Sequence, residues 1–168
     1  MKALIIGCGG AGKSTLARRL GAKDGTPVVH LDAEYWQAGW VEPTPDEWAA
    51  RLHELVARPA WIMDGNYGGS IRERAAEADL VVMLDRPRLV CLANVLRRRW
   101  QHRGRTRPDM ADGCPERIDP KFLKWIWDYP KVSGPKVRRR LADAGFADLV
   151  TLRTTREIEA FVEAWPPR

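Results

Sequence analysis

The sequence has 168 residues, of which 45% are hydrophobic and 30% are charged, a composition typical of a folded globular domain. This composition excludes a disordered chain, and no apolar run approaches the length of a membrane span, so we expect a cytoplasmic protein without a secretory signal. The three cysteines are odd in number and far apart, which indicates neither a disulfide framework nor a zinc site. The net charge of +6 favours an anionic partner, such as a nucleotide, a phosphorylated metabolite or nucleic acid.

Apolar runs alternate with helical patterns along the chain. In chain order, the expected strands lie at residues 2–6, 26–32, 60–64, 79–85 and 146–152. The expected helices lie at residues 14–20, 44–56, 71–77, 89–100, 119–129, 133–144 and 154–165. Gly21 is expected to end the first helix, and residues 101–117, rich in Gly, Pro and Arg, are expected to form a loop. The pattern predicts one α/β domain, residues 1–168, in which helices cover both faces of a five-stranded parallel sheet.

The segment GCGGAGKST, residues 7–15, lies between the first expected strand and the first expected helix. It matches the phosphate-binding pattern G-x-x-x-x-G-K-[ST] in the strand–loop–helix context that this pattern requires. Glycines let backbone N–H groups point toward an anion at the positive end of the following helix dipole. We therefore expect ATP to be bound by Gly7, Gly9, Gly10, Ala11, Gly12, Lys13, Ser14 and Thr15. Lys13 is expected to act on the β- and γ-phosphates and Ser14 to ligate Mg²⁺; the alternative is a glycine-rich turn with an incidental lysine.

The chain has neither the D-x-x-G nor the N-K-x-D motif, which excludes a typical GTPase. It resembles small nucleoside-monophosphate kinases of the adenylate-kinase type in three segments, GCGGAGKST, MDGNY and LDRP. It resembles the FlaR-type topology-modulation group of adenylate-kinase-related proteins more closely, in HLDAEYWQAGW, DGNYGG and RGRTRPDM…GCPERID…FLKWIW. The resemblance spans most of the chain. It implies a P-loop NTPase fold of three layers, phosphoryl transfer from ATP to a small acceptor, and a short basic lid at about residues 101–120.

Two carboxylates follow expected strands, at the edge where open α/β sheets bind ligands. By the resemblance, Asp64 matches the Asp that holds Mg²⁺ through water in adenylate kinases; the alternative is an Asp that caps the next turn. Asp32 ends the strand at 26–32, where it is expected to accept a proton from an acceptor hydroxyl or to hydrogen-bond an acceptor base or sugar. The alternative for Asp32 is the capping of a helix or turn.

The acceptor itself is left open by the residues after the second expected strand. Adenylate-kinase relatives usually carry an arginine there for the acceptor phosphate, whereas residues 33–36 are Ala-Glu-Tyr-Trp. Arg72 and Arg74 are then the nearest candidates for an acceptor clamp. A planar or apolar acceptor is indicated by four aromatic residues, which alternatively serve only packing: Tyr35, Trp36, Trp40 and Tyr67. The acceptor is therefore either a monophosphate or a small molecule with a hydroxyl group.

Arginines crowd the end of the helix at 89–100 and the loop after it: Arg97, Arg98, Arg99, Arg103, Arg105 and Arg107. In a phosphotransferase such a cluster forms a lid that excludes water and stabilises transition-state charge, so we expect catalytic roles for Arg98 and Arg103. By the resemblance, Arg98 takes the place of a phosphate-binding arginine at the base of the lid. Asn94 stands where the adenylate-kinase pattern has an adenine-stacking arginine. The alternative for the arginine cluster is a solvated basic face.

The leading prediction is an ATP- and Mg²⁺-dependent phosphotransferase that acts on a small acceptor. One alternative is a nucleotide-dependent regulatory protein associated with DNA topology, which a basic lid also suits. Another is a simple NTPase that uses water as its acceptor. Positive charge beside a polyphosphate site accounts for much of the net charge, so nucleic acid is possible as a partner but not required.

Overall fold

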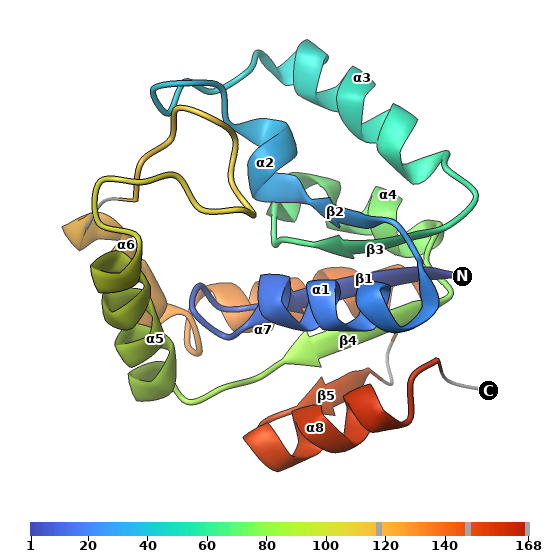
Figure 1. Cartoon of the computed structure of the whole chain (residues 1–168). Coiled ribbons are helices and arrows are strands. Elements are labelled where there is room, and N and C mark those ends of the chain that lie inside the picture. The colour runs from blue at the N-terminus through green and yellow to red at the C-terminus, as the bar shows by residue number, and fades with distance from the viewer. Residues whose placement is uncertain (117–118, 147–148, 167–168) are drawn as a thin grey trace.

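A parallel sheet lies at the centre of the computed structural model, which describes residues 1–116, 119–146 and 149–166 (Figure 1). Its strands are β1 (Lys2–Gly7), β2 (Val28–His30), β3 (Trp61–Asp64), β4 (Leu80–Leu84) and β5 (Val150–Leu152). The strand order is β2-β3-β1-β4-β5, and every neighbouring pair is parallel. The expected five-stranded parallel sheet is confirmed. Residues 147 and 148 of the last expected strand, and residue 117 of the expected loop, lie outside the described residues.

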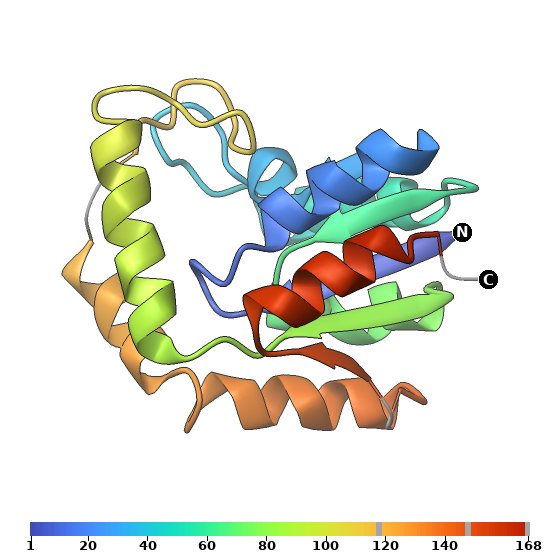
Figure 2. The same cartoon turned by 60° about the horizontal axis from the view of Figure 1, so that its bottom comes forward.

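Helices cover both faces of the sheet, as expected for this class. They are α1 (Lys13–Asp24), α2 (Leu31–Tyr35), α3 (Pro45–Val56), the short 3₁₀ helix η1 (Gly68–Ser70), α4 (Ile71–Ala76), α5 (Arg88–Gln101), α6 (Pro120–Asp128), α7 (Ser133–Asp143) and α8 (Thr155–Glu163). One face packs on α1 and α8 and the other on α3, α4 and α7, while α5 and α6 stand beyond the carboxyl ends of the strands (Figures 1 and 2). Within the described ranges, none of these helices is long and apolar enough to cross a bilayer.

The first strand shows why its sequence is apolar at every position. Ala3 and Ile5 belong to the core on the side of α1 and α8, whereas Leu4 and Ile6 belong to the core on the side of α3, α4 and α7. All four side chains are fully buried. Since successive side chains of a strand point to opposite faces, a strand covered on both faces needs apolar residues throughout. Burial of each of the three larger side chains contributes roughly 1.5–3 kcal/mol to folding.

The first helix is longer than expected, and the prediction that Gly21 ends it is wrong. The helix runs to Asp24 and ends at Gly25, whose left-handed backbone (φ 75°) lets its N–H donate to the carbonyl of Gly21. Gly21 instead allows close packing against β2. A Cβ at this position would lie 2.5 Å from Cγ2 of Val28 and 2.8 Å from the carbonyl oxygen of Thr26.

The second strand is shorter than expected, and the prediction that it ends at Asp32 is wrong. The strand ends at His30, and Asp32 lies in the first turn of α2. Val28 and Val29 favour a strand, whereas the three residues after Leu31, Asp-Ala-Glu at 32–34, have low strand propensity. The helix begins only one residue before Asp32, so this carboxylate still lies at the carboxyl edge of the sheet.

The close approach at Gly21 gives a test of the packing between α1 and β2. Replacement of Gly21 by Ala should lower the free energy of unfolding by about 1–3 kcal/mol, although alanine favours helices, because the added methyl group overpacks the core. Equilibrium urea unfolding measures this change. Gly69→Ala is the control, since a Cβ there meets no atom within 4 Å. If both variants were as stable as the parent, the helix would not be packed this closely.

Candidate active site

The phosphate-binding segment forms a tight loop between β1 and α1. Gly10 has φ 78°, and a Cβ there would lie 2.2 Å from the carbonyl oxygen of Cys91, so only glycine fits. Helix α1 begins at Lys13, directly after the loop, and leaves its first backbone N–H groups for an anion. The Lys13 ammonium group reaches back over the loop and donates to the carbonyl of Cys8 at 3.0 Å. The loop therefore has the form of a phosphate cradle.

Helix α5 packs directly on this loop. The Asn94 side-chain amide donates to the carbonyl of Gly10 at 2.9 Å, so it holds the loop in place. Arg97 and Arg98 follow one helical turn later and line the same cavity as the loop. Asn94 thus supports the phosphate loop from the position where the adenylate-kinase pattern has an adenine-stacking arginine.

A buried ionic network ties α5 to the loop that follows it, residues 102–116, which we call the lid loop. Nε of Arg98 donates to Oε1 of Glu116 at 2.9 Å, and Nε of Arg107 pairs with Oε2 of the same carboxylate at 2.7 Å. Glu116 and Arg107 are both buried. Burial and the nearby Arg107 charge lower the pKa of the Arg98 guanidinium, although Glu116 offsets part of this shift. The network fixes Arg98 toward the cavity.

Asp64 ends β3, next to β1 in the sheet, and its side chain is almost completely buried. Its Oδ1 lies 2.8 Å from Nδ1 of His30, the last residue of β2. Burial alone would lower the pKa of His30, but the hydrogen bond and the charge of Asp64 outweigh it and raise that pKa. The next polar residue, Asn66, accepts a hydrogen bond from the backbone N–H of Gly7 at 3.2 Å. The segment that contains Asp64 and Asn66 is therefore connected to the phosphate loop by a hydrogen bond.

Asp109 of the lid loop is a site residue that sequence reasoning missed. Its carboxylate lies near the Ser14 hydroxyl and pairs with Arg107 at 3.3 Å and with Arg18 at 3.5 Å. Burial alone would raise the pKa of Asp109, but the Arg107 charge and the Ser14 hydroxyl outweigh it and lower that pKa. In the sequence, Asp109 is marked only as an acidic residue within the basic segment RGRTRPDM. Its position beside α1 depends on the fold.

An aromatic wall stands on the other side of the cavity, over β2 and β3. Trp36, Trp40 and Tyr67 line the cavity, and the Tyr67 hydroxyl donates to Oδ1 of Asp32 at 2.8 Å. Burial and the charge of Asp32 raise the pKa of Tyr67, so it stays a hydrogen-bond donor. Tyr35 is not among the lining residues. Its ring packs against Trp36, Trp48 and Tyr67 from behind.

Of the arginines that the sequence proposes for an acceptor clamp or for catalysis, Arg72, Arg74 and Arg103 do not line the cavity. Arg72 lies on the surface, where it pairs with Asp143 at 2.6 Å. Arg74 is fully buried and donates to the carbonyls of Gly65, Asn66 and Tyr67, so it supports the loop after β3; burial lowers its pKa to about 10. Arg103 is exposed, and its backbone forms a bridge with Glu116. The structure therefore does not bring Arg72 or Arg103 to the site.

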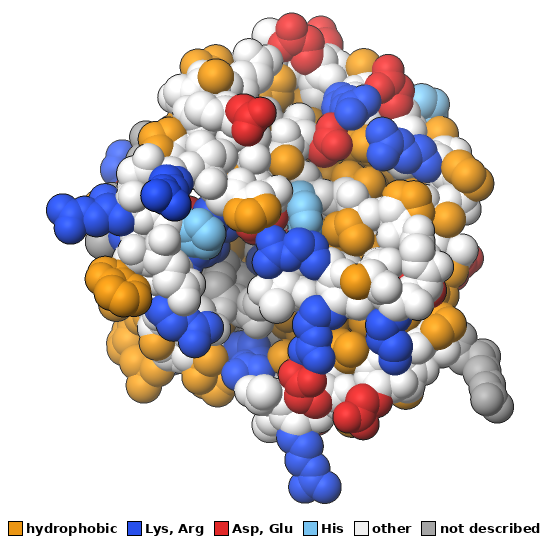
Figure 3. All heavy atoms as spheres, viewed as in Figure 1, with side chains coloured by type: hydrophobic (Ala, Val, Ile, Leu, Met, Phe, Trp, Pro, Cys, Tyr) orange, Lys and Arg blue, Asp and Glu red, His pale blue; other side chains and the backbone are white. Residues whose placement is uncertain are grey.

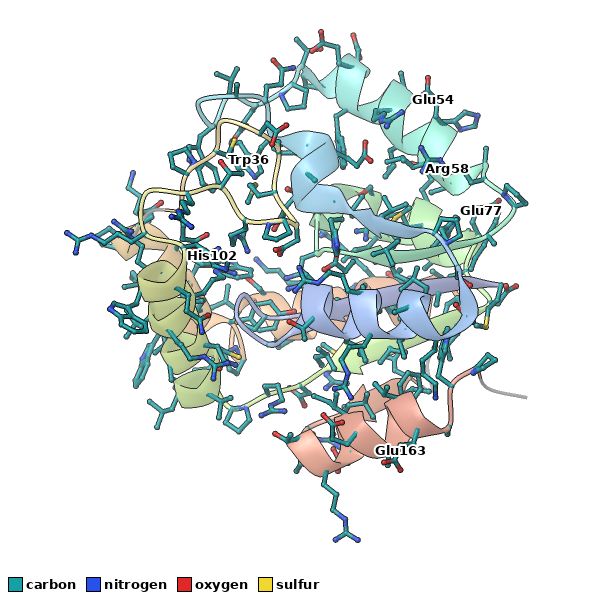
Figure 4. The ribbon with its side chains drawn as sticks, viewed as in Figure 1. Trp36, Glu54, Arg58, Glu77, His102 and Glu163 are labelled. Carbon is teal, nitrogen blue, oxygen red and sulfur yellow. The ribbon has the colours of Figure 1, made fainter. Side chains whose placement is uncertain are left out.

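These elements enclose one cavity of about 1210 Å³ that extends from the phosphate loop to the aromatic wall. Figure 3 shows the molecule hollowed beside α5, with Lys and Arg side chains around the opening. Trp36 lies beside the lid loop, His102 lies at the start of that loop, and both line the cavity (Figure 4). The lid loop is docked onto residues 37–41: Gly39 N–H donates to Gly113 at 2.9 Å, and the Trp40 indole donates to Pro115 at 3.2 Å. The lid loop thus covers the end of the cavity that holds the aromatic wall.

The oxygen donors of Ser14, Asp64 and Asp109 suit Mg²⁺, which prefers hard oxygen ligands. Among the described residues, no group of three or more His, Cys, Asp or Glu side chains is close enough to hold a metal by itself. This arrangement fits Mg²⁺, which is usually bound by one or two protein ligands, several waters and substrate phosphates.

Comparison with solved structures identifies the fold. The structure is similar to shikimate kinase from Acinetobacter baumannii in complex with shikimate, with a TM-score of 0.63, 20% identity, and coverage of 96% of this chain and 88% of that chain. It is similar to deoxyadenosine kinase from M. mycoides with bound dATP, with a TM-score of 0.52, 13% identity, and coverage of 97% and 98%. It is also similar to a gluconokinase from Sinorhizobium meliloti 1021, with a TM-score of 0.53, 16% identity, and coverage of 96% and 91%.

No protein-family model matches the sequence, and no curated protein matches it either. The identities with the solved structures are low, so these likenesses establish the fold alone. The chain has the fold of P-loop kinases, as the sequence predicts. The closer resemblance to the FlaR-type group stays a prediction.

The ionic network under the lid loop can be tested through Glu116. Glu116→Gln should lower the free energy of unfolding by about 3 kcal/mol, because the buried Arg107 and the half-buried Arg98 lose their shared negative partner. Asp143→Asn, which removes an exposed partner of Arg72, should cost less than about 1 kcal/mol. Urea unfolding measures both changes, and hydrogen exchange reports whether the lid loop opens in the Gln variant. Equal, small effects of the two substitutions would contradict the buried network.

Proposed function

We propose that this protein is an ATP- and Mg²⁺-dependent phosphotransferase of the adenylate-kinase-like type, which transfers the γ-phosphoryl group of ATP to a small acceptor. The observation that carries the proposal is the phosphate loop with Lys13 at the start of α1, opening into a cavity that also holds Asp32 and Arg98. The solved structures with the same fold are kinases of shikimate, deoxyadenosine and gluconate by their names, which supports phosphoryl transfer as the type of reaction.

The donor nucleotide would be held by the backbone of residues 7–15 and by Lys13. Mg²⁺ would be held by Ser14 and, directly or through water, by Asp64, and when bound it would neutralise charge on the phosphates. His30 orients Asp64 through its 2.8 Å contact. Arg98, fixed by Glu116, would stabilise negative charge on the transferred group. In this proposal, the main-chain cradle binds the phosphates, and a few charged side chains bind Mg²⁺ and stabilise the transferred group.

The acceptor would lie between Asp32 and the aromatic wall. Asp32 already accepts one hydrogen bond from Tyr67, which fixes the carboxylate. Asp32 is then positioned to take the proton of an acceptor hydroxyl as general base. The lid loop covers this end of the cavity and would exclude water from it, which favours transfer to an acceptor over hydrolysis.

Lys13→Ala is the direct test of the proposal. Loss of the ammonium group should abolish ADP release from Mg-ATP and reduce the thermal stabilisation by Mg-ATP, because the β- and γ-phosphates lose their cationic partner. Lys124→Ala, in the exposed pair with Asp128, is the control and should behave as the parent. ADP release is measured with nucleoside monophosphates, nucleosides, sugars and small alcohols, with duplex DNA in a parallel reaction. Unchanged turnover of Lys13→Ala would refute the assignment, and release stimulated only by DNA would favour the regulatory alternative.

Arg98→Ala tests the role of the lid base. The substitution should lower kcat by about 10³-fold or more while weakening ATP affinity much less, since the guanidinium is proposed to act on charge that develops during transfer. Arg72→Ala is the matched control, because Arg72 lies outside the cavity. Steady-state kinetics gives kcat, and calorimetric titration with ATP gives the affinity. A fall in affinity alone would make Arg98 a binding residue rather than a catalytic one.

A further inference from the structure

The residues at the acceptor end of the cavity determine which charge an acceptor can carry, an inference that rests on the proposed function. Its polar centre is the hydrogen bond that the Tyr67 hydroxyl donates to Oδ1 of Asp32 at 2.8 Å. Trp36 lies near Tyr67 and lines the same cavity. Because the Tyr67 hydroxyl proton is already donated to Asp32, this pair offers carboxylate oxygens that accept hydrogen bonds. It therefore suits a ligand group that donates a hydrogen bond, such as a hydroxyl or an ammonium group.

The backbone at this wall is strained in two places. Trp40 has φ 65° and Tyr67 has φ 31°, and they are the non-glycine residues with positive φ among those the structure describes. Large aromatic residues rarely adopt this conformation, and such strain clusters where a ligand site fixes the side chains. Arg74 supports one of them by donating to the carbonyl of Tyr67 at 3.1 Å. Both residues line the cavity, so the fold fixes aromatic rings at the same end of the cavity as Asp32.

Among the residues that the structure describes, five arginines around this end are already engaged by other groups of the protein. The pairs and partners are Arg18 with Asp109, Arg51 with Glu34, Arg72 with Asp143, Arg107 with Glu116, and Arg74 with the carbonyls of residues 65–67. Arg97 and Arg98 lie one turn beyond Asn94, which contacts the phosphate loop, so they stand at the donor end. Of the described side chains, a phosphate or carboxylate on the acceptor would meet Asp32 and aromatic rings instead of the bidentate arginines that such anions need.

We propose that the subsite formed by Asp32, Trp36, Trp40 and Tyr67 takes a neutral or cationic alcohol and excludes phosphate monoesters and other anions. A ring or apolar face of the alcohol stacks on Trp36 or Trp40, and a cationic amine gains further from the ring faces. In the transfer, the alcohol oxygen forms the new bond to the γ-phosphorus, and the bond from that phosphorus to the β–γ bridging oxygen breaks. ADP leaves with the bonding electron pair, and the hydroxyl proton passes to Asp32. The products are ADP and a phosphate monoester.

Matched pairs of an alcohol and its phosphate ester test the charge preference. Adenosine with AMP, glucose with glucose 6-phosphate, and ethanolamine with phosphoethanolamine are titrated into the protein saturated with Mg-ADP, and ADP release from Mg-ATP is measured for each. At least one alcohol should bind at least about 10-fold more tightly than its phosphate ester and should support ADP release. Its binding should quench tryptophan fluorescence, and Trp36→Phe should reduce the quenching.

Asp32→Asn tests the role of the carboxylate, with Glu34→Gln as the control from the same helix. The Asn variant keeps the Tyr67 contact but should lower kcat for the alcohol by about 100-fold or more, whereas the Gln variant should stay within about twofold. Tighter binding of a phosphate ester than of its alcohol overturns the inference. So does the absence of any response to the alcohols while Mg-ATP still stabilises the protein, an outcome that leaves the phosphate cradle intact. If Mg-ATP itself fails to bind, the proposed function fails first.

Discussion

The close packing of the phosphate loop against β4 and α5 is the constraint on which the rest of the site depends. A Cβ at Gly7 would lie 2.5 Å from the carbonyl oxygen of Leu84, and one at Gly10 would lie 2.2 Å from that of Cys91. Asn94 of α5 strengthens the packing of α5 on the loop by donating a hydrogen bond to the carbonyl of Gly10. Because the loop and α5 cannot move apart without losing these contacts, the start of α1 and the arginines of α5 keep a fixed relation across the cavity.

The strand order then separates the cavity into two ends. The phosphate loop follows β1 in the centre of the sheet, whereas Asp64 and Asp32 follow β3 and β2 toward one edge. The first end is made of backbone N–H groups and the second of side chains. His30, Asp64 and Asn66 lie between them and link the two by hydrogen bonds. The lid loop joins both ends, since Asp109 reaches Ser14 and Gly113 reaches Gly39.

Sequence patterns predict those parts of the fold that depend on local chemistry. The apolar strands, the alternation with helices and the phosphate loop follow from short-range periodicity and from glycine spacing, and all of them are present. The predicted end of α1 is wrong, because Gly21 is required for a tertiary contact, its close packing against Val28, and not for ending the helix. Asp109 and Asn94 acquire their partners only when segments distant in the sequence meet, so no local pattern predicts these contacts. The positions of Arg72 and Arg103 outside the cavity depend on tertiary contacts in the same way.

The donor end of the cavity is built from main chain and the acceptor end from side chains, and this difference decides which substitutions evolution can accept. Substitutions in the cradle meet backbone atoms that have no room to retreat, so Gly7 and Gly10 tolerate almost none. The side chains of Trp36, Trp40 and Tyr67 line the cavity, so a substitution among them alters the shape of the acceptor end while the main-chain cradle is kept. Selection for a new acceptor can therefore act on these side chains, while the donor half stays the same.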